Sequence, residues 1–474
     1  MRRIALIALA VLACRGNTSI HDPGPLDRFF YPTGLAVLAV PVASGGTTTY
    51  HQRLLVASSN ADLTYDSETG GSVIAVNPEA APVSVTGAMN VKSFAGELGL
   101  VDPDACPALA AGSPAAAFVP IRGQDVVYRL DVGADGAPSC HAGGCTIPVG
   151  ASVRGDPWST GVACDTASSP GGASLARAYV GYLRETNGDA WLTQIDLKKQ
   201  PTDDGYVQHG TFGYGQIRAM AYDASRRRLY LARTVVGTGT SLGYVDLAND
   251  CRIDATYAAG GCPNGSTPTR TNASLAVAGE VPYGVELRSI ALAHETDPAS
   301  PVRRAYVTGR IYDPIASAQA GVRVGDFDGL LFVVDLSENE AGVLQFDVVN
   351  EIPIGYGAAD VRVLPQRFDP VTGAPRADVV AALAADDGVV WIYDDETGAT
   401  IAIGRDPLTG APLVGHMPQG LAVDPHALPG TSTARLYVGS FQEHFVTAID
   451  VPLDDPATFD PNTGMHRITG GVLP

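Results

Sequence analysis

Short apolar runs separated by turn residues recur along the whole chain, and they recur in a fixed order. The clearest set lies at the C-terminal end, where the runs occupy residues 419–425, 435–439, 445–450 and 466–470. Each run is four to seven residues long and is bounded by Gly, Pro, Asp or other turn residues, which is typical of β-strands. Four such runs in succession predict a small antiparallel sheet of four strands.

The same order of runs occurs six more times, with the second unit the most divergent. These units begin near Thr33, Leu98, Thr160, Arg218, Arg288 and Asp360. Seven four-stranded units predict an all-β fold, a seven-bladed β-propeller of antiparallel blades over residues 28–474, because propellers close with four to eight blades. A β-helix would need shorter and more uniform repeats.

The ends of the chain indicate how the ring closes. Residues 465–472 supply the fourth strand of the last unit, so we expect closure without exchange of a strand between the ends, with Phe29, Phe30 and Tyr31 packed at the seam. The composition fits this architecture: 45% of the residues are apolar, 17% are charged, and 54 glycines and 34 prolines favour turns over long helices.

The N-terminal residues are typical of a secretory signal. Arg2 and Arg3 precede an apolar run of about ten residues, which is too short to span a bilayer. The run ends in Val11-Leu12-Ala13-Cys14. We therefore expect a signal peptide at 1–13 and a tether at 14–27. Ordinary signal cleavage with an incidental cysteine remains the alternative.

Six further cysteines agree with export. An even number in a chain with a signal sequence favours three disulfides formed in an oxidising compartment. The preferred pairs are Cys140–Cys145, Cys251–Cys262 and Cys106–Cys164. Six cysteines allow fifteen connectivities, so the alternatives stay open.

The formal net charge of −19 excludes two classes of partner. No run of basic residues forms a stripe, so we expect neither nucleic acid nor an anionic lipid surface to bind. Membrane contact is expected only through the N-terminal anchor.

Repeated R-x-Y-V and V-x-x-I-D elements, such as 435–438 and 446–450, resemble those of the YVTN (YncE-like) surface-layer propellers and of the lactonase-like propellers. The start of the chain resembles a lipobox of bacterial lipoproteins, which implies a lipid on Cys14. Arg15 after it implies the outer membrane, by analogy with lipoprotein sorting. The repeated residues build blades, so we expect the aspartates that end the third runs to accept N–H groups of turns. These aspartates are Asp196, Asp246, Asp335, Asp394 and Asp450.

One mouth of the propeller channel is the best candidate for a ligand site. In a propeller the first strand of each blade lines the channel, so the residue before it rims a mouth. Alignment of the units on Gly420 gives a ring of Thr33, Glu97, Thr160, Arg218, Arg288, Ala359 and Gln419. Arg218 and Arg288 belong to adjacent blades and together suit a carboxylate or phosphate.

The more frequent alternative is that these arginines pair with a neighbouring carboxylate such as Glu286, or point into water. A deep funnel closed around Arg218, Arg288 and Glu97 would favour an enzyme. Rim side chains spread into open solvent would count against an enzyme.

Other motifs do not indicate catalysis. The loop from Cys140 to Cys145 contains His141 but has no second ligand pair at zinc spacing. The acidic segments 60–70 and 325–329 lack the spacing of an EF-hand loop. His416 and His444 lie in the last unit, but the sequence does not bring them together. We therefore predict no catalytic residue, no metal and no cofactor.

These observations favour a non-catalytic lipoprotein of the cell envelope that uses its propeller as a scaffold for an envelope protein or a small anionic ligand. A protein partner would map to one face or to the insertion at 313–327. One alternative is a lactonase-like hydrolase that acts on a small anionic substrate at the channel mouth. The other is the propeller subunit of a periplasmic redox complex.

Overall fold

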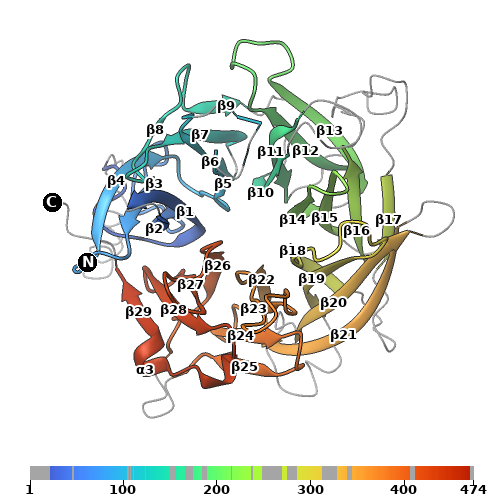
Figure 1. Cartoon of the computed structure of the whole chain (residues 1–474). Helices are drawn as coiled ribbons and strands as arrows, with labels where there is room; N and C mark the ends of the chain where they lie inside the picture. Colours follow the sequence, from blue (N-terminus) through green and yellow to red (C-terminus); the bar gives the residue numbers. More distant parts are fainter. Residues whose placement is uncertain are drawn as a thin grey trace, which may run out of the picture.

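The computed structural model shows a ring of small sheets around a central channel (Figure 1). The structure describes residues 22–44, 47–103, 106, 108–109, 112–122, 124–148, 156–165, 174–183, 189–214, 216–235, 239–247, 270–274, 285–311, 328–338, 344–405 and 412–469. These residues form seven antiparallel blades, so the predicted propeller is confirmed. In each blade the strands follow one another outward from the channel in chain order.

The strands of the first four blades have the following bounds. Blade 1 contains β1 (Pro32–Ser44), β2 (Thr47–Ser58), β3 (Gly71–Asn77) and β4 (Ser84–Val91). Blade 2 contains β5 (Gly99–Val101), β6 (Ala115–Ile121), β7 (Val126–Val132), β8 (Pro138–Cys140) and β9 (Thr146–Pro148). Blade 3 contains β10 (Pro157–Cys164), β11 (Ala176–Tyr182), β12 (Asp189–Asp196) and β13 (Val207–Tyr214). Blade 4 contains β14 (Gln216–Asp223), β15 (Arg228–Val235), β16 (Gly239–Asp246) and β17 (Arg270–Ser274).

The last three blades are built in the same way. Blade 5 contains β18 (Val285–Leu292), β19 (Arg303–Ile311), β20 (Asp328–Glu338) and β21 (Leu344–Tyr356). Blade 6 contains β22 (Ala358–Val363), β23 (Val379–Ala384), β24 (Val389–Asp394) and β25 (Thr400–Ile403). Blade 7 contains β26 (Pro418–Val423), β27 (Thr433–Ser440), β28 (Phe445–Pro452) and β29 (Met465–Ile468), with a short 3-10 turn η2 (Pro456–Thr458) and the helical turn α3 (Pro461–Gly464) before β29.

The burial of each strand follows from its place in the ring. Every residue of β11 and of β23 is buried, because neighbouring blades cover both faces of the second strand. The inner strand β10 instead alternates buried and half-buried residues. This alternation places one face of β10 toward the channel. The hydrophobic core therefore lies between blades, as shown by the cluster that joins Leu55 and Ala75 of blade 1 to Val119 and Leu130 of blade 2.

The repeated arginine and aspartate residues have a structural role. Arg304 donates to Asp335 at 2.8 Å, and Arg435 donates to Asp450 at 2.6 Å, each across a pair of strands in one blade. Asp196 and Asp394 accept backbone N–H groups of the turns that follow them, both at 3.1 Å. The side chain of Asp246 lies outside the described residues.

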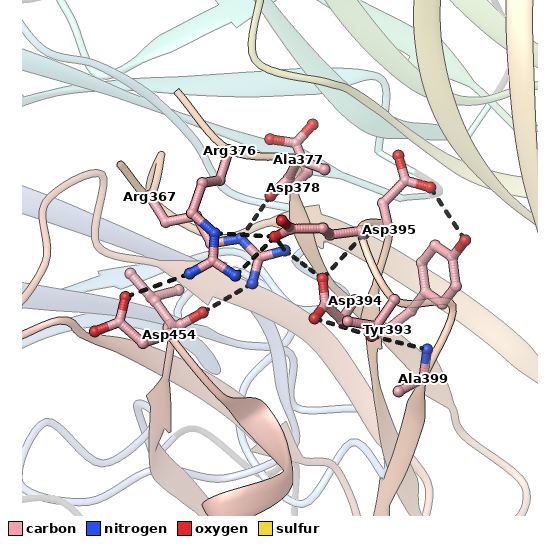
Figure 2. Close-up of polar contacts among 12 residues, drawn as sticks. Arg367, Arg376, Ala377, Asp378, Tyr393, Asp394, Asp395, Ala399 and Asp454 are labelled. Carbon is pink, nitrogen blue, oxygen red and sulfur yellow. Dashed lines mark hydrogen bonds and ion pairs between the residues drawn. The ribbon is translucent and has the colours of Figure 1, made fainter. Parts of the chain in front are cut away.

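Buried ion pairs connect neighbouring blades. Arg227 of blade 4 makes a bidentate contact with Asp165 of blade 3, at 2.7 and 2.9 Å. Arg367 of blade 6 forms a second buried ion pair, with Asp394 of its own blade (Figure 2). Its guanidinium group also donates to the carbonyl oxygen of Leu453 in blade 7 at 3.1 Å. The Arg367 side chain is only 2% exposed. The Arg367 guanidinium group also contacts Glu396 at 3.1 Å, so its charge is compensated within blade 6, and the bond to Leu453 connects it to blade 7.

Blades 1 and 7 close the ring with complete sheets, so the predicted closure without strand exchange is confirmed. Phe29 is buried at this seam against residues of both blades, including Leu54 and Tyr437. The side-chain amide of Gln52 donates to Asp424 at 2.5 Å, and Tyr437 donates to Gln52.

The segment before the seam already belongs to blade 1. Asp66 donates its backbone N–H to Asp22 at 2.9 Å, and Gly24 donates to Thr69 at 2.9 Å. The attached part of the chain therefore begins before the expected boundary at residue 28.

Two disulfides are present among the described residues, and both match the preferred pairing. Cys106 of the β5–β6 loop is bonded to Cys164 at the end of β10, and Cys140 is bonded to Cys145 beside β8. Cys14, Cys251, Cys262 and the insertion at 313–327 lie outside the described residues. In the described part of the chain, no helix is long and apolar enough to cross a membrane.

Candidate functional site at the channel mouth

The inner strands carry a β-bulge close to their first residue. Irregularities of this kind interrupt the pairing between Pro32 and Gly34, Pro157 and Ser159, Ile217 and Ala219, Leu287 and Ser289, Ala358 and Val361, and Pro418 and Leu421. A bulge leaves one residue unpaired and turns its side chain away from the pleat. The bulged residues of six blades therefore form a ring at one end of the channel.

These residues line a cavity of about 240 Å³ at the mouth. Six of the seven residues in the ring expected from sequence lie in its wall: Thr33, Glu97, Arg218, Arg288, Ala359 and Gln419. Thr160 does not. It lines a second cavity of about 300 Å³ deeper in the channel.

The residue of the inner strand β10 that reaches the mouth is Trp158, and Leu183 after β11 lines the same cavity. The alignment on Gly420 was therefore wrong by two residues in blade 3. The physical reason is that the bulge of β10 lies earlier in the strand than the aligned glycine indicates.

Sequence reasoning missed two arginines of the mouth. Arg122 directly follows β6, and Arg310 lies near the end of β19, and both line the cavity. The ends of second strands lie beside the starts of first strands, because the two strands are antiparallel, as in the pairing of Val285 with Ile311. Inspection of the residues that end each second run would have found both arginines.

Arg218 and Arg288 share one carboxylate oxygen. Glu286 Oε1 accepts from Arg218 Nη2 at 3.0 Å and from Arg288 Nη1 at 2.6 Å. The alternative that Glu286 pairs with these arginines is thus correct. The pairing still leaves donors unused, since the buried Nε of Arg218 has no hydrogen-bond partner among the described residues. Each guanidinium side chain is 21% exposed, so neither spreads into open solvent.

Arg310 and Arg122 complete the cationic wall. Arg310 lies opposite Glu286 in the β18–β19 pairing and donates to the carbonyl oxygens of Ala358 at 2.6 Å and Gly357 at 3.1 Å. The guanidinium carbon of Arg122 lies 5.5 Å from the ring centre of Trp158, a cation–π contact. Neither arrangement neutralises the positive charge.

The electrostatics reflect this crowding of like charges. Burial lowers the pKa of Arg218 to about 10, and repulsion from Arg288 lowers it further in the same direction. Burial and repulsion from Arg288 also lower the pKa of Arg310 to about 10. Both groups remain cationic at neutral pH. A pKa lowered by neighbouring cations indicates a site that would gain from a bound anion.

Glu97 lies where the mouth cavity meets the deeper one. Burial raises the pKa of Glu97 to about 8, with a further contribution from Asp360, although hydrogen bonds from the Trp158 side chain and the Thr160 backbone act against this. This raised pKa favours the protonated, neutral form of the Glu97 carboxyl group at pH 7. In that form the group adds no negative charge beneath the arginines.

Asp360 lines both cavities, but its negative charge is directed to partners other than the four arginines of the mouth. It accepts from Ser289 Oγ at 2.7 Å, from the backbone of Leu421 at 2.8 Å and from Arg362 at 2.6 Å. Its charge is thus compensated locally by Arg362, and the mouth does not depend on it for balance.

Backbone strain is concentrated on the face that carries the mouth. Nine non-glycine residues among those described have positive φ, and eight of them lie in loops at this end of the blades. The eight are Tyr31, Asn60, Leu63, Phe94, Asp125, Asp156, Met417 and His444. Left-handed backbone in residues with a side chain costs free energy and clusters at functional sites. This observation is independent of the arginines and indicates the same face.

The remaining motifs have local partners. His416 and His444 lie at the same end of blade 7, but His416 contacts Glu443 at 2.6 Å and His444 accepts the backbone N–H of Tyr31 at 3.0 Å. In the loop at 60–70, Asp66 accepts backbone N–H groups of its own turn. His141 contacts Asp131 at 2.9 Å.

A metal site is the other kind of site that the described side chains could form. Among the residues that the structure describes, no group of three or more His, Cys, Asp or Glu residues is arranged to hold a metal ion.

A larger cavity of about 470 Å³ opens on the opposite face, between blades 5 and 6. Its central charged groups compensate one another: Arg304 contacts Asp335 and Asp395, and Asp378 accepts from His294 and Tyr306. This cavity therefore lacks the excess of positive charge that distinguishes the mouth.

Comparison with known proteins supplies no family. No protein-family model matches the chain, and no curated protein matches it in sequence. A periplasmic gluconolactonase from Pseudomonas aeruginosa is similar in structure, with 14% identity over 76% of this chain and 94% of that one, and a TM-score of 0.34.

Two further solved structures are similar at the same level. A hypothetical selenium-binding protein from Sulfolobus tokodaii has 12% identity over 93% of this chain and 92% of that one, with a TM-score of 0.45. The Dos1 propeller has 10% identity over 85% and 79%, with a TM-score of 0.41. Sequence identities and TM-scores this low say nothing about which ligand this chain binds or which reaction it catalyses.

Proposed function

We propose that this propeller is a binding protein that takes a small anionic ligand at the mouth of its channel. The observation that carries the proposal is the cluster of Arg122, Arg218, Arg288 and Arg310 in the wall of one cavity, in a chain whose net charge is −19. Positive potential focused in a cleft attracts anions, and guanidinium groups suit carboxylate and phosphate oxygens. The cluster of arginines supports a small anionic ligand over an envelope protein as the partner of this scaffold.

Titration calorimetry with phosphate and with succinate tests the proposal. The Arg218→Gln/Arg288→Gln double variant should bind at least about tenfold more weakly than the unmodified protein, because two charge-assisted contacts are lost. Arg467→Gln is the matched control, since Arg467 is exposed on β29 and contacts the carbonyl oxygen of Pro412. Equal affinity in all three proteins would remove the mouth from the functional account.

The neutral Glu97 supports a second candidate, a hydrolase acting on a small anionic ester or lactone. A carboxylic acid that titrates near pH 8 can donate a proton to a leaving oxygen, as general acids do. Turnover of a lactone or ester that carries a carboxylate is the test. Hydrolysis that is lost in Glu97→Gln, while anion binding persists, would favour the enzyme over the binding protein.

We further propose that the protein is exported and attached to the cell envelope, at the outer membrane, by a lipid on Cys14. The Cys106–Cys164 and Cys140–Cys145 disulfides support the exported location, because such bonds persist in oxidising compartments. Metabolic labelling with palmitate is the test. Label should enter the wild-type protein and be absent from Cys14→Ser, and label in neither would refute the anchor.

A further inference from the structure

We infer that the ligand of the mouth is a small dianion, and that Glu286 is an internal carboxylate which the ligand displaces from Arg218 and Arg288. The inference rests on the proposed function and names the ligand class for the same site. It follows from the balance of charge around the cavity, from the contacts of Glu286 and from the size of the cavity.

The charges around the mouth leave an excess of two. Arg122, Arg218, Arg288 and Arg310 line the cavity, and the other three are each close enough to Arg218 to lower its pKa. The carboxylates that act on these arginines are Glu286 and Asp386. The other two acids nearby do not contribute, because Glu97 is neutral at pH 7 and Asp360 is compensated by Arg362. A ligand with two negative charges would balance the site.

The contacts of Glu286 show where one anionic group fits. A single oxygen, Oε1, lies within 3.0 Å of donors from both Arg218 and Arg288, which come from different blades. An oxygen of a ligand carboxylate or phosphate at this point would receive the same two hydrogen bonds. The unused Nε of Arg218 offers a third donor nearby. Arg218 would then hold a ligand group by two nitrogens instead of one.

Glu286 can leave this position at modest cost. Its side chain is 23% exposed and lies near the start of the strand β18, so rotation toward water would rehydrate the carboxylate. Arg310 lies opposite it in the sheet and provides an alternative partner. In the free protein Glu286 thus reduces repulsion among the arginines, and a ligand has to compete with it.

The size of the mouth cavity suits a small ligand. Sites for drug-sized molecules measure about 300–1,000 Å³. The mouth cavity, at about 240 Å³, lies below this range. A four-carbon dicarboxylate or a phosphate group with a short substituent is of suitable size.

The experiment compares probes of equal size and different charge. Succinate carries two negative charges at pH 7, and succinamate, its monoamide, has the same number of non-hydrogen atoms and one charge. At constant ionic strength we expect succinate to bind at least about tenfold more tightly, since one full charge interacts at short range with the arginines. Sulfate against nitrate is a second pair that does not depend on the shape of a carbon chain.

The Glu286→Gln variant tests the displacement. It keeps the shape of the side chain and removes its charge, so succinate and succinamate should each bind several-fold more tightly. A folded Glu286→Gln protein that binds more weakly would show that Glu286 positions the arginines, and would overturn the inference while leaving the proposed function intact.

The charge pairs decide the remaining outcomes. Equal affinity for succinate and succinamate, and for sulfate and nitrate, would overturn the dianion. Absence of binding by every probe would overturn the proposed function together with the inference. If Glu286→Gln does not fold, the affinities of the unmodified protein for succinate and succinamate, and for sulfate and nitrate, decide whether the ligand is a dianion.

Discussion

At the scale of single residues, the chemistry of the mouth comes from side chains whose charges are incompletely compensated. Arg218 and Arg288 share one oxygen of Glu286, and Arg122 is in contact only with an aromatic ring among the interactions described for its side chain. Buried Arg227 and Arg367 differ, because each meets a carboxylate and also connects two blades: Arg227 through Asp165, and Arg367 through the carbonyl oxygen of Leu453. The same residue type thus stabilises the structure where its partners are sufficient, and leaves positive charge and unused donors at the mouth where partners are scarce.

Glu97→Gln should change how anion binding depends on pH. Because the pKa of Glu97 is raised to about 8, a carboxylate forms beneath the arginines as pH rises through that value, and the affinity for anions should fall. The variant should keep its affinity between pH 7 and pH 9, as measured by calorimetry. Glu443→Gln is the control, because Glu443 pairs with His416 outside the cavity wall.

The same substitution has a consequence for stability with a definite sign. Below about pH 4.5 Glu97 is protonated in both the folded and unfolded chains, and it costs nothing. As pH rises from there to about 8, only the unfolded chain releases the proton, so the folded state loses stability. Glu97→Gln should therefore raise the free energy of unfolding at pH 7. If the difference in free energy of unfolding between Glu97→Gln and the unmodified protein stays the same from pH 4.5 to pH 8, the raised pKa of Glu97 is wrong.

At the scale of elements, β-bulges and covalent links decide how neighbouring blades present their side chains. The bulges of the inner strands turn Trp158, Arg218 and Arg288 toward the mouth. The β5–β6 loop of blade 2 is joined to blade 3 by the disulfide between Cys106 and Cys164. Cys106 is itself 1% exposed, so the link passes through the hydrophobic cluster between the two blades.

Removal of this disulfide should destabilise the protein without changing the mouth. The bond closes a loop with a sequence separation of 58. Loss of such a constraint on the unfolded chain lowers the free energy of unfolding by about 2–4 kcal/mol. Denaturant unfolding of Cys106→Ala/Cys164→Ala measures it, with Cys140→Ala/Cys145→Ala as a control that opens a loop of only five residues and should lose less. A larger loss in the control would contradict the argument from loop length.

At the scale of the whole molecule, the ring is closed by side chains, since blades 1 and 7 exchange no strand. The closing contacts join residues that are far apart in the chain. Gln52 contacts Asp424 and Tyr437, and the ring of Tyr50 stacks on His426 at 3.8 Å between ring centres. Asp424 is only 2% exposed at this seam, and this burial raises the pKa of its carboxyl group.

Gln52→Ala should weaken the closure. The substitution leaves the buried side chains of Asp424 and Tyr437 without this partner, at a cost of about 1–3 kcal/mol for each unsatisfied group. Thermal unfolding followed by circular dichroism should show a lower Tm, whereas alanine at the neighbouring half-buried Arg53 should have a smaller effect. A Tm equal to that of the unmodified protein would mean that the apolar seam around Phe29 closes the ring without the polar contacts.

The sequence by itself determined the number of blades, the absence of strand exchange and the position of most of the rim. It could do so because each blade is a local unit of four short runs, and strand periodicity and turn residues act over a few positions. Arg218 and Arg288 were found for the same reason, since both begin a repeated run.

Only the tertiary structure decided which side chains meet at the mouth. It replaced Thr160 by Trp158, added Arg122 and Arg310, and placed Glu97 where burial keeps it protonated. These features depend on bulges and on contacts between blades, such as that of Arg218 with Glu286, which are separated by 68 residues in sequence. A repeat pattern reports how each blade is built, but the partner and the dielectric surroundings of a charge are set by the neighbouring blade.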